Sequence, residues 1–516
     1  MKVQIGISLI LAAVASVLAE LYGYRLPTIS WGYNLTRTAG ELNLIQPLKW
    51  MIENLGHLTA VVFFLTGGWL IFSKWQAGPP NPVTVRKIAR FKSIKRGYYS
   101  FLILMALAGF AALDQLVVGK EALAVKYEGK WTFPAFTVEL EKNSDFGITD
   151  EKRAILEPNY REFKKEKGYT VILPLRPYDP TQDTISALGR PIDPAELDYN
   201  GLGTRLFDPG EPEKPHLRFT YRKGKRQGNG QGWDEKGNRI YKANFEKGEL
   251  VEGSVEWTGE GTVEEFLALS DEQEYDVSYP ASEPQLSFPL GTTPRGDDVL
   301  AYLYGGLQVN FKAALIFIPI VYFIGISLGL LMGFFGGWFD LVVQRLIEVL
   351  ANIPFLFLVI IVTLGVPPQY KDRLGFYLII ILLAAFGWMG MTSLMRTAAL
   401  KEKARDYIAA SRVIGAGVTR ILFRHLLPNT VAILVTLVPF SISGLILSLT
   451  ALDYLGFVPS DLASWGKLLK DGLDSLSSPW LVSAAFVSLV TLLVLVTFVG
   501  EAVREAFDPK KYTFYR

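Results

Sequence analysis

Long apolar runs most constrain what this chain can fold into. A helix needs about 20 mostly apolar residues to cross the hydrocarbon core of a bilayer, which is about 30 Å thick. Several runs in the 516-residue sequence approach that length, and half of all residues are hydrophobic. The runs are residues 3–21, 57–72, 98–118, 310–335, 341–366, 374–394, 431–452 and 481–499. The sequence therefore predicts an all-α polytopic membrane protein with about eight spans.

The first of these runs has a second interpretation. Lys2 precedes an apolar stretch that ends in small residues, which is also the pattern of a secretory signal peptide. Removal of such a peptide leaves the topology downstream unchanged, because the next span still starts outside. Both interpretations stay open at this point.

The distribution of charge predicts which side of the membrane each connection faces. Lys and Arg accumulate in the cytoplasmic connections of membrane proteins. Residues 74–96 contain seven of them and no acidic residue, and the 396–424 connection and the C-terminal tail are also basic. Residues 453–478 instead carry four aspartates against two lysines. We therefore expect residues 76–97, residues 396–430 and both termini in the cytoplasm, and residues 453–478 outside.

One long polar segment, residues 119–300, interrupts the apolar runs and falls outside by alternation. Its length and its aromatic side chains are sufficient for a folded domain. Short alternating stretches at residues 218–222 and 239–245 are separated by Lys-Gly turns, which predicts β-hairpins. The hairpins near residues 218–257 resemble repeats of the MORN (membrane occupation and recognition nexus) type. We expect a β-meander within a large, partly β extracytosolic domain, and a docking surface for a binding protein is the alternative.

The predicted layout has five parts. Residues 1–75 form two extra N-terminal transmembrane helices, and residues 76–97 form a basic cytoplasmic segment. Residues 98–118 form the first core span. Residues 119–300 form the extracytosolic domain between spans 3 and 4. Residues 301–516 form the core domain, with five helices.

The sequence lacks the residues and motifs that the usual catalytic and metal sites need. The chain has no cysteine and only three histidines, which are far apart, so a metal site built from these residues is not expected. It contains neither an H-E-x-x-H pattern nor a phosphate-binding G-x-x-x-x-G-K-[ST] loop. We therefore expect no catalytic residue, metal or cofactor, and any ATP-hydrolysing site must lie in a separate chain. The spans are almost free of charge near their centres, which argues against a secondary transporter.

The polar, basic stretch 406–429 lies between two long apolar runs. Its arginines, Arg420 among them, exclude burial in lipid, where each costs at least about 2.5–3.5 kcal/mol. The stretch should therefore lie in the cytoplasm beside the membrane. One interpretation is a basic loop that is held by anionic lipid headgroups. That interpretation explains the arginines but not the small residues of the stretch.

These small residues are Ala409, Ala410, Ser411 and Gly415. Their lack of bulk lets another protein surface approach a short helix closely. Gly415 costs helix stability, by about 1 kcal/mol relative to Ala, and Gly417 adds a second weak point, so we expect a break before the helix resumes near Val418. Pro428 suits a first helical turn, because its missing N–H would be unpaired there anyway. The pattern predicts a helix that docks into a groove of another protein.

The same stretch resembles the cytoplasmic signature of ABC importer permeases, E-A-A-x3-G-x9-I-x-L-P. Ala409, Ala410 and Ser411 take the E-A-A places, Gly415 takes the glycine place, and Leu427 and Pro428 take the closing L-P places. The chain departs from the pattern by the missing glutamate, by Ser411 in place of the last alanine and by His425 in place of isoleucine, while Asp406 supplies an acid three residues upstream. The resemblance implies that the loop 396–430 forms a coupling helix that docks into an ATP-hydrolysing subunit.

Three further stretches resemble permeases of the oligopeptide and dipeptide family, of the C-subunit type and its microcin C-like branch. They are residues 125–136, 290–300 and 500–509, and Thr293 and Asp297 stand where the family has Asp and Arg. The resemblance implies a type I importer permease in a bacterial inner membrane that carries peptides or peptide-like solutes. It also implies a second permease subunit in a heterodimer, two ATP-binding subunits and an extracytosolic solute-binding protein. Membrane lipid surrounds such a subunit, and nucleic acid has no role.

Two questions stay open in the sequence. Four glycines recur every four residues: Gly325, Gly329, Gly333 and Gly337. They would line one helix face and let another backbone come close, either in this chain or in a partner permease. In the next run, Arg345 and Glu348 can pair on one face, and Pro354 predicts a kink. The alternative function is a membrane-anchored sensor or binding protein that acts through its extracytosolic domain.

Overall fold

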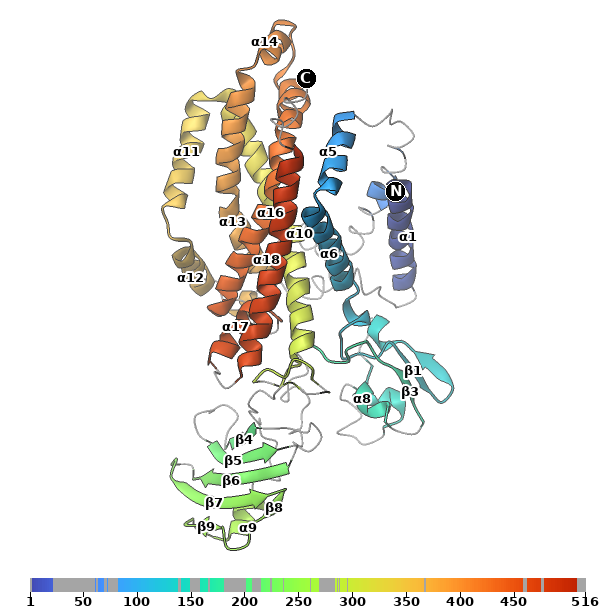
Figure 1. Cartoon of the computed structure of the whole chain (residues 1–516), viewed down its shortest axis with the longest axis vertical. Coiled ribbons are helices and arrows are strands. Elements are labelled where there is room, and N and C mark those ends of the chain that lie inside the picture. Colours follow the sequence, from blue (N-terminus) through green and yellow to red (C-terminus); the bar gives the residue numbers. More distant parts are fainter. Residues whose placement is uncertain are drawn as a thin grey trace.

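The apolar runs fold into a bundle of long helices, and β-structure lies beyond one end of it (Figure 1). The computed structural model describes, with short gaps, residues 2–21, 61–72, 82–148, 158–180, 201–206, 215–268 and 284–507. The helices that build the bundle are α6 (Lys95–Ala112), α10 (Val299–Phe335), α11 (Gly337–Ala351), α12 (Phe355–Gly365), α13 (Pro368–Lys403), α16 (Leu427–Tyr454) and α18 (Pro479–Phe507).

Four helices in the described residues are long and apolar enough to cross a membrane as straight spans. They contain Val299–Phe335, Phe376–Lys403, Ile433–Tyr454 and Pro479–Phe507. At 1.5 Å per residue, the 37 residues of α10 reach about 55 Å, so this helix extends beyond the hydrocarbon core. The side chain of Asp298 caps the N-terminus of α10, because it accepts hydrogen bonds from the N–H groups of Leu300 and Ala301.

The run at residues 341–366 is not one straight span, in contrast to the expectation. It forms α11 and α12, which are bent by 82° relative to each other. Pro354 lies at the bend, as predicted, because proline cannot donate the N–H that a continuous helix needs. Asn352 supports the end of α11 by donating from Nδ2 to the carbonyl of Glu348 at 2.8 Å. If the bent pair counts as one span, the described residues contain up to five.

The N-terminal region differs in detail from the expected spans. Residues 3–21 lie in helix α1 (Lys2–Leu21), whose apolar part, Gly6–Ala19, is shorter than a span. The run 57–72 lies largely outside the described residues. In the run 98–118, α6 ends at Ala112, and a short 3-10 helix, η1 (Asp114–Leu116), follows. The number of about eight spans in the whole chain therefore stays a prediction.

The basic segment before α6 forms helix α5 (Pro82–Ser93), which lies against the end of α18. Lys87 lies over the ring of Phe507, at 4.6 Å from its centroid. Arg90 and Glu505 approach to 3.9 Å. These contacts place the expected cytoplasmic segment at the end of the bundle where α18 ends.

The polar segment contains two separate antiparallel sheets. The first has the order β2-β1-β3 and consists of β1 (Ala124–Tyr127), β2 (Lys130–Thr132) and β3 (Thr170–Ile172). Short helices η2 (Pro134–Phe136), η3 (Asn143–Phe146) and α8 (Tyr160–Phe163) accompany it. Its core packs Val125 and Val171 against the aromatic rings of Phe146, Tyr160 and Phe163.

The second sheet is the meander that the hairpin pattern predicted. Its strands run in the order β4-β5-β6-β7-β8, and β9 pairs with β7. They are β4 (Gly201–Leu206), β5 (Pro215–Arg222), β6 (Lys225–Trp233), β7 (Arg239–Glu246), β8 (Glu249–Leu250) and β9 (Glu256–Trp257). Leu217, Phe219, Tyr241 and Phe245 form its core with Phe266 of α9 (Val263–Ala268).

A tight turn between β6 and β7 carries a carboxylate with many donors. The Oδ1 atom of Asp234 accepts from the N–H groups of Asn238 at 2.7 Å and Lys236 at 3.0 Å. The side-chain amide of Asn238, together with these backbone donors, holds the pKa of Asp234 below its ordinary value. Gly237 takes a positive φ of 83°, which glycine adopts without strain.

Candidate coupling helix and membrane cavity

A short helix, α14 (Asp406–Val413), lies at the end of the bundle opposite the second sheet (Figure 1). It ends at Val413, and Gly415, two residues further on, has a φ of 86°. The N–H of Ala416 donates to the carbonyl of Ser411 at 3.0 Å, and the N–H of Gly415 donates to that of Arg412 at 2.9 Å. This left-handed C-terminal turn is the break that the glycine predicted, and helix α15 (Val418–Arg420) begins where expected.

The chain then enters the membrane span through a wider helical turn. Residues Ile421–Leu426 form a π-helix, η5, that leads into α16. Pro428 lies in the first turn of α16, as predicted. Because proline has no N–H, the carbonyl of Arg424 cannot receive the usual bond from four residues ahead, which favours the wider turn.

The predicted docking residues occupy two environments. The exposed ones are Asp406, Ala409, Ala410, Gly415, Arg420 and Pro428, and the half-buried ones are Ser411 and Leu427. The hydroxyl of Ser411 donates to the carbonyl of Tyr407 at 2.7 Å, so it is turned onto its own helix. Asp406 lies in the first turn of α14, where a negative charge is favourable. The small-residue surface is therefore open at the end of the bundle.

Two apolar residues at the end of α14 were not predicted as part of this surface. Val413 and Ile414 are 88% and 86% exposed. Exposed apolar side chains at the tip of a polar loop are typical of a protein contact. The only signal in the sequence is an apolar pair directly before Gly415, and such a pair is more often part of a core.

The first turn of α14 is fixed, in contrast to its tip. Ile408 is 1% exposed and packs in the main core cluster with Ile421, Leu422 and Leu426. Beside it, the Tyr407 hydroxyl donates to Oε2 of Glu402 at 2.8 Å. Burial raises the pKa of Tyr407 above its ordinary value, and the hydrogen bond to Glu402 adds to this effect. The first turn of α14 is thus attached to the spans, while Val413 and Ile414 beyond its other end are exposed.

Basic side chains also connect this region to the end of α10. Lys403 donates from Nζ to the carbonyl of Phe334 at 2.6 Å. A cation is favourable at that place, because the last carbonyls of a helix carry partial negative charge. Arg412 of α14 lies over the ring of Phe334, at 5.3 Å from its centroid.

Three of the four periodic glycines bring α10 and α13 into close contact. A Cβ atom at Gly325 would lie 2.6 Å from a side-chain carbon of Met391. At Gly329 it would lie 2.6 Å from the carbonyl oxygen of Thr392, and at Gly333 it would lie 2.8 Å from that of Arg396. These glycines therefore pack against a helix of the same chain.

Gly337 does not belong to this face, in contrast to the prediction. Helix α10 ends at Phe335, and both Gly336 and Gly337 have positive φ values, of 66° and 59°. The two glycines form the turn into α11, so a repeat of four residues has no meaning there.

A further pattern, Gly-x-Ser-x-Gly at residues 325–329, resembles the nucleophile turn of some hydrolases. It lies inside the continuous helix α10 and lacks the strand-to-helix turn that this chemistry needs.

An ion pair attaches α11 to α13. Arg396 donates from Nε to Oδ1 of Asp340 at 2.5 Å and from Nη2 to Oδ2 at 2.6 Å. Such a two-point contact fixes orientation as well as distance. The predicted pair of Arg345 and Glu348 also forms, at 2.5 Å, on an exposed part of α11.

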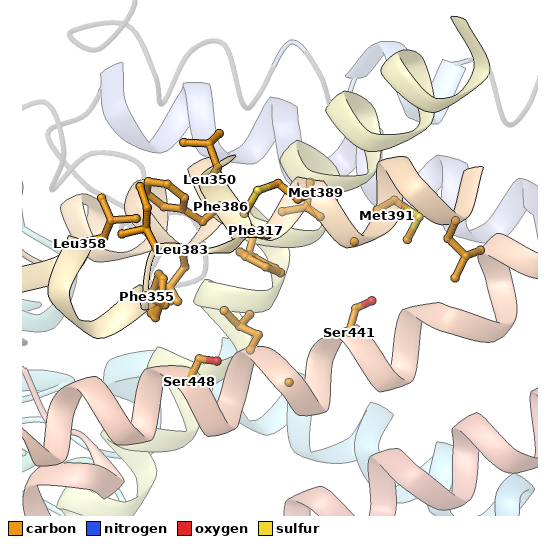
Figure 2. A pocket seen from close by; sticks show the side chains of 18 of the residues that line it. Phe317, Leu350, Phe355, Leu358, Leu383, Phe386, Met389, Met391, Ser441 and Ser448 are labelled. Carbon is orange, nitrogen blue, oxygen red and sulfur yellow. The ribbon is translucent and has the colours of Figure 1, made fainter. Parts of the chain in front are cut away.

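A cavity of about 730 Å³ lies among α10, the bend between α11 and α12, α13 and α16. Figure 2 shows rings of Phe317, Phe355 and Phe386 on one side and the hydroxyls of Ser441 and Ser448 on α16. The residues that line it include no charged side chain. In the part of the chain that the structure describes, no cluster of His, Asp and Glu is suited to hold a metal ion.

At the other end of α10, the motif of residues 290–300 forms a buried contact. Thr293 and Asp297 bond to each other, since the Thr293 hydroxyl donates to Oδ2 of Asp297 at 3.0 Å. Arg176 donates from Nε to Oδ2 of Asp298 at 2.6 Å. Burial alone would lower the pKa of Arg176. The hydrogen bond to Asp298 and the charge of Asp298 together outweigh burial, so this pKa lies above its ordinary value. The first small sheet is thus joined to the first turn of α10.

Comparison with known proteins agrees with this arrangement. Residues 325–511 match the family described as binding-protein-dependent transport system inner membrane component. The inner membrane ABC transporter permease protein YejE of Escherichia coli is 30% identical over 432 residues, 84% of this chain and 98% of that protein. The peptidoglycan transport system permease protein YejE of Agrobacterium fabrum is 36% identical over 250 residues, 47% of this chain, and the match spans 64% of that relative.

Shorter matches include a third relative. The oligopeptide transport system permease protein OppC of Bacillus subtilis is 31% identical over 225 residues, 43% of this chain and 71% of that protein. All three relatives are permeases, and none supports the alternative of a sensor. The chain therefore belongs to the family of inner membrane permease subunits of binding-protein-dependent ABC transport systems.

Proposed function

We propose that this chain forms half of the translocation pathway of an ATP-driven importer for peptides or peptide-like solutes. Family membership makes it a permease subunit and not an enzyme, so ATP hydrolysis belongs to a separate chain. The solute class is carried over from the oligopeptide relative and from the peptidoglycan relative, whose solute contains peptide. The apolar cavity with two serine hydroxyls is the part of this chain that we assign to the pathway.

The proposed partners are a second permease subunit, two ATP-binding subunits and an extracytosolic solute-binding protein. The orientation follows from charge, because the basic segments 76–97 and 396–430 favour the cytoplasm. This places α14 and the C-terminus in the cytoplasm of a bacterial cell, and it places both sheets outside the inner membrane. The two additional N-terminal helices are proposed to anchor or brace the subunit.

One observation carries the proposal, namely the helix α14 with a fixed first turn and a free, apolar tip. Ile408 is buried against the spans, while Val413 and Ile414 are almost fully exposed. Ala409 and Ala410 add a surface without bulk between these two parts. An exposed helix with such a face fits a groove on an ATP-binding subunit. The missing glutamate at position 409 means that shape and apolar contact, more than one acidic residue, hold this interface.

Co-purification of the ATP-binding subunits tests this assignment. We expect Ala410→Arg to lower the amount of bound ATP-binding subunit at least about tenfold, because a long charged side chain would fill the space that the partner approaches. Ile414→Asp should act in the same direction, because it places a charge in an apolar contact. Uptake of a labelled peptide should fall in parallel.

Ala89→Arg on α5 is the matched control. Ala89 is an exposed alanine in another helix at the same end of the bundle. This variant should retain both the ATP-binding subunits and uptake. The proposal is refuted if Ala410→Arg behaves like Ala89→Arg, or if the unaltered chain never associates with an ATP-binding subunit.

A further inference from the structure

One hydrogen-bonded cluster joins the base of α14 to two spans. It consists of Glu402 near the end of α13, Tyr407 in the first turn of α14 and Asn429 in the first turn of α16. The Tyr407 hydroxyl donates to Oε2 of Glu402 at 2.8 Å. The same hydroxyl accepts from Nδ2 of Asn429, also at 2.8 Å. A single oxygen atom thus connects three helices, and we call this group the Tyr407 cluster.

The two outer members of the cluster are held in place by further bonds. The side chain of Glu402 is only 15% exposed, and its Oε1 accepts from Nε of Arg405 at 3.0 Å. Asn429 also donates to the carbonyl of His425 at 2.8 Å, within the π-helical turn. A bond to a carboxylate is stronger than one between neutral groups. The cluster is therefore well suited to transmit a displacement and not merely to fill space.

The spans that the cluster joins are the ones that face each other across the cavity. Met391 and Leu394 of α13 line one part of it, and Leu437 and Ser441 of α16 line another. These residues lie in the same two helices whose ends carry Glu402 and Asn429. The first turn of α14, where Tyr407 lies next to the buried Ile408, is the place at which one side chain bonds to both of these spans.

We propose that Tyr407 is a positioning residue that makes α13 and α16 move together when a bound partner displaces α14. This inference rests on the proposed function, since it assumes that an ATP-binding subunit moves the helix. The hydroxyl is the essential part, because the ring alone can pack against its neighbours but cannot bond to Glu402 and Asn429. Without the hydroxyl, α14 still binds its partner through the exposed tip, and the movement reaches the two spans incompletely.

The substitution Tyr407→Phe isolates this role, because it removes one oxygen atom and retains the ring. The experiment uses the complete transporter in liposomes, with its partner permease, ATP-binding subunits and binding protein. A labelled library of tripeptides serves as the transported probe. The measured quantity is the amount of peptide taken up per ATP hydrolysed. We expect this ratio to fall about fivefold, the effect of about one lost hydrogen bond, while the ATP-binding subunits still co-purify.

Two further variants separate transmission from a general loss of structure. Asn429→Ala should lower the ratio as well, and the double variant should be no worse than Tyr407→Phe alone, because both changes break one connection. Tyr169→Phe is the control, since the hydroxyl of Tyr169 donates to the carbonyl of Phe146 in η3, beside the first sheet, at 2.8 Å. That variant should retain the ratio of the unaltered chain.

The inference is overturned if Tyr407→Phe transports as many peptides per ATP as the unaltered chain. It is also overturned if the variant loses its ATP-binding subunits while the remaining complexes keep a normal ratio, because Tyr407 would then only maintain the shape of α14. Failure of the proposed function looks different. In that case the unaltered chain itself shows no association with an ATP-binding subunit and no ATP-dependent uptake.

Discussion

The close contact between α10 and α13 predicts that Gly329→Ala destabilises the bundle. A Cβ atom at this position would lie 2.5 Å from Cβ of Met395, 2.6 Å from the carbonyl oxygen of Thr392 and 2.9 Å from the nitrogen of Arg396. An ordinary contact begins at 3.4 Å, so the first of these distances is short by about 0.9 Å. Two of the three neighbours are backbone atoms, which no change of rotamer can move. The two helices must therefore separate.

The expected loss in free energy of unfolding is about 1–3 kcal/mol for the forced separation. Alanine regains up to about 1 kcal/mol of helix propensity, so the net loss is about 0–2 kcal/mol when that regain is complete. Gly109→Ala in α6 gives the matched control, because Gly109 is exposed and nothing lies within 4 Å of its added Cβ atom. That variant should be as stable as the unaltered chain or slightly more so.

Thermal unfolding of the purified chain in detergent measures both variants under the same conditions. We expect Gly329→Ala to unfold a few degrees lower than Gly109→Ala. Equal unfolding temperatures would show that α10 and α13 are not in backbone contact through this glycine. The reasoning about the whole glycine face would then fail, because Gly325 and Gly333 rest on the same geometry.

Three other perturbations have defined outcomes. The side-chain and backbone amides of its turn hold the pKa of Asp234 below its ordinary value. The ionised carboxylate therefore stabilises the second sheet at any pH above the ordinary pKa of Asp, and this stabilisation is lost as the pH falls through the lowered pKa. Asp234→Asn should weaken this dependence on acid pH, as measured by hydrogen exchange of the second sheet. Arg396→Lys keeps the charge but loses the two-point contact with Asp340, and it should lower the free energy of unfolding by about 1–2 kcal/mol in denaturant titrations. Arg176→Gln should speed hydrogen exchange in the first turn of α10, because Asp298 loses the partner that orients it as a helix cap.

The sequence predicts best those features that depend on one residue and its neighbours. The end of α14 follows from Gly415, because the positive φ of the turn there is favourable only for a residue without a side chain. The bend after α11 follows from Pro354. The limit of this reasoning appears at Gly337, where a repeat of four residues continues past the end of α10. A periodic pattern cannot reveal where a helix stops, since that depends on the φ values of the two glycines in the turn.

Contacts between residues that are distant in sequence could not be predicted. Tyr407 and Asn429 are 22 positions apart, and neither residue stands out by composition. Ile414 is 86% exposed, whereas Ile408, six positions earlier, is 1% exposed, and the sequence alone does not distinguish the two apolar side chains. Thr293 and Asp297 are instructive in another way. Both depart from the family pattern, and they bond to each other, so the two departures are the two ends of one contact.

The attachments of the helices indicate where the cavity can change. The glycine face holds α10 against α13, and the ion pair of Asp340 with Arg396 holds α11 against α13. On the side of α16, Gly444 lines the cavity and has no atom within 4 Å of an added Cβ. Between α16 and α10, the hydroxyls of Tyr322 and Ser441 share one hydrogen bond at 3.1 Å, which is a weaker attachment than the glycine face or the ion pair. The Tyr407 cluster joins α16 to α13 where both meet α14, so the peptide-per-ATP ratio of Tyr407→Phe tests whether this link carries movement to the two helices that line the cavity.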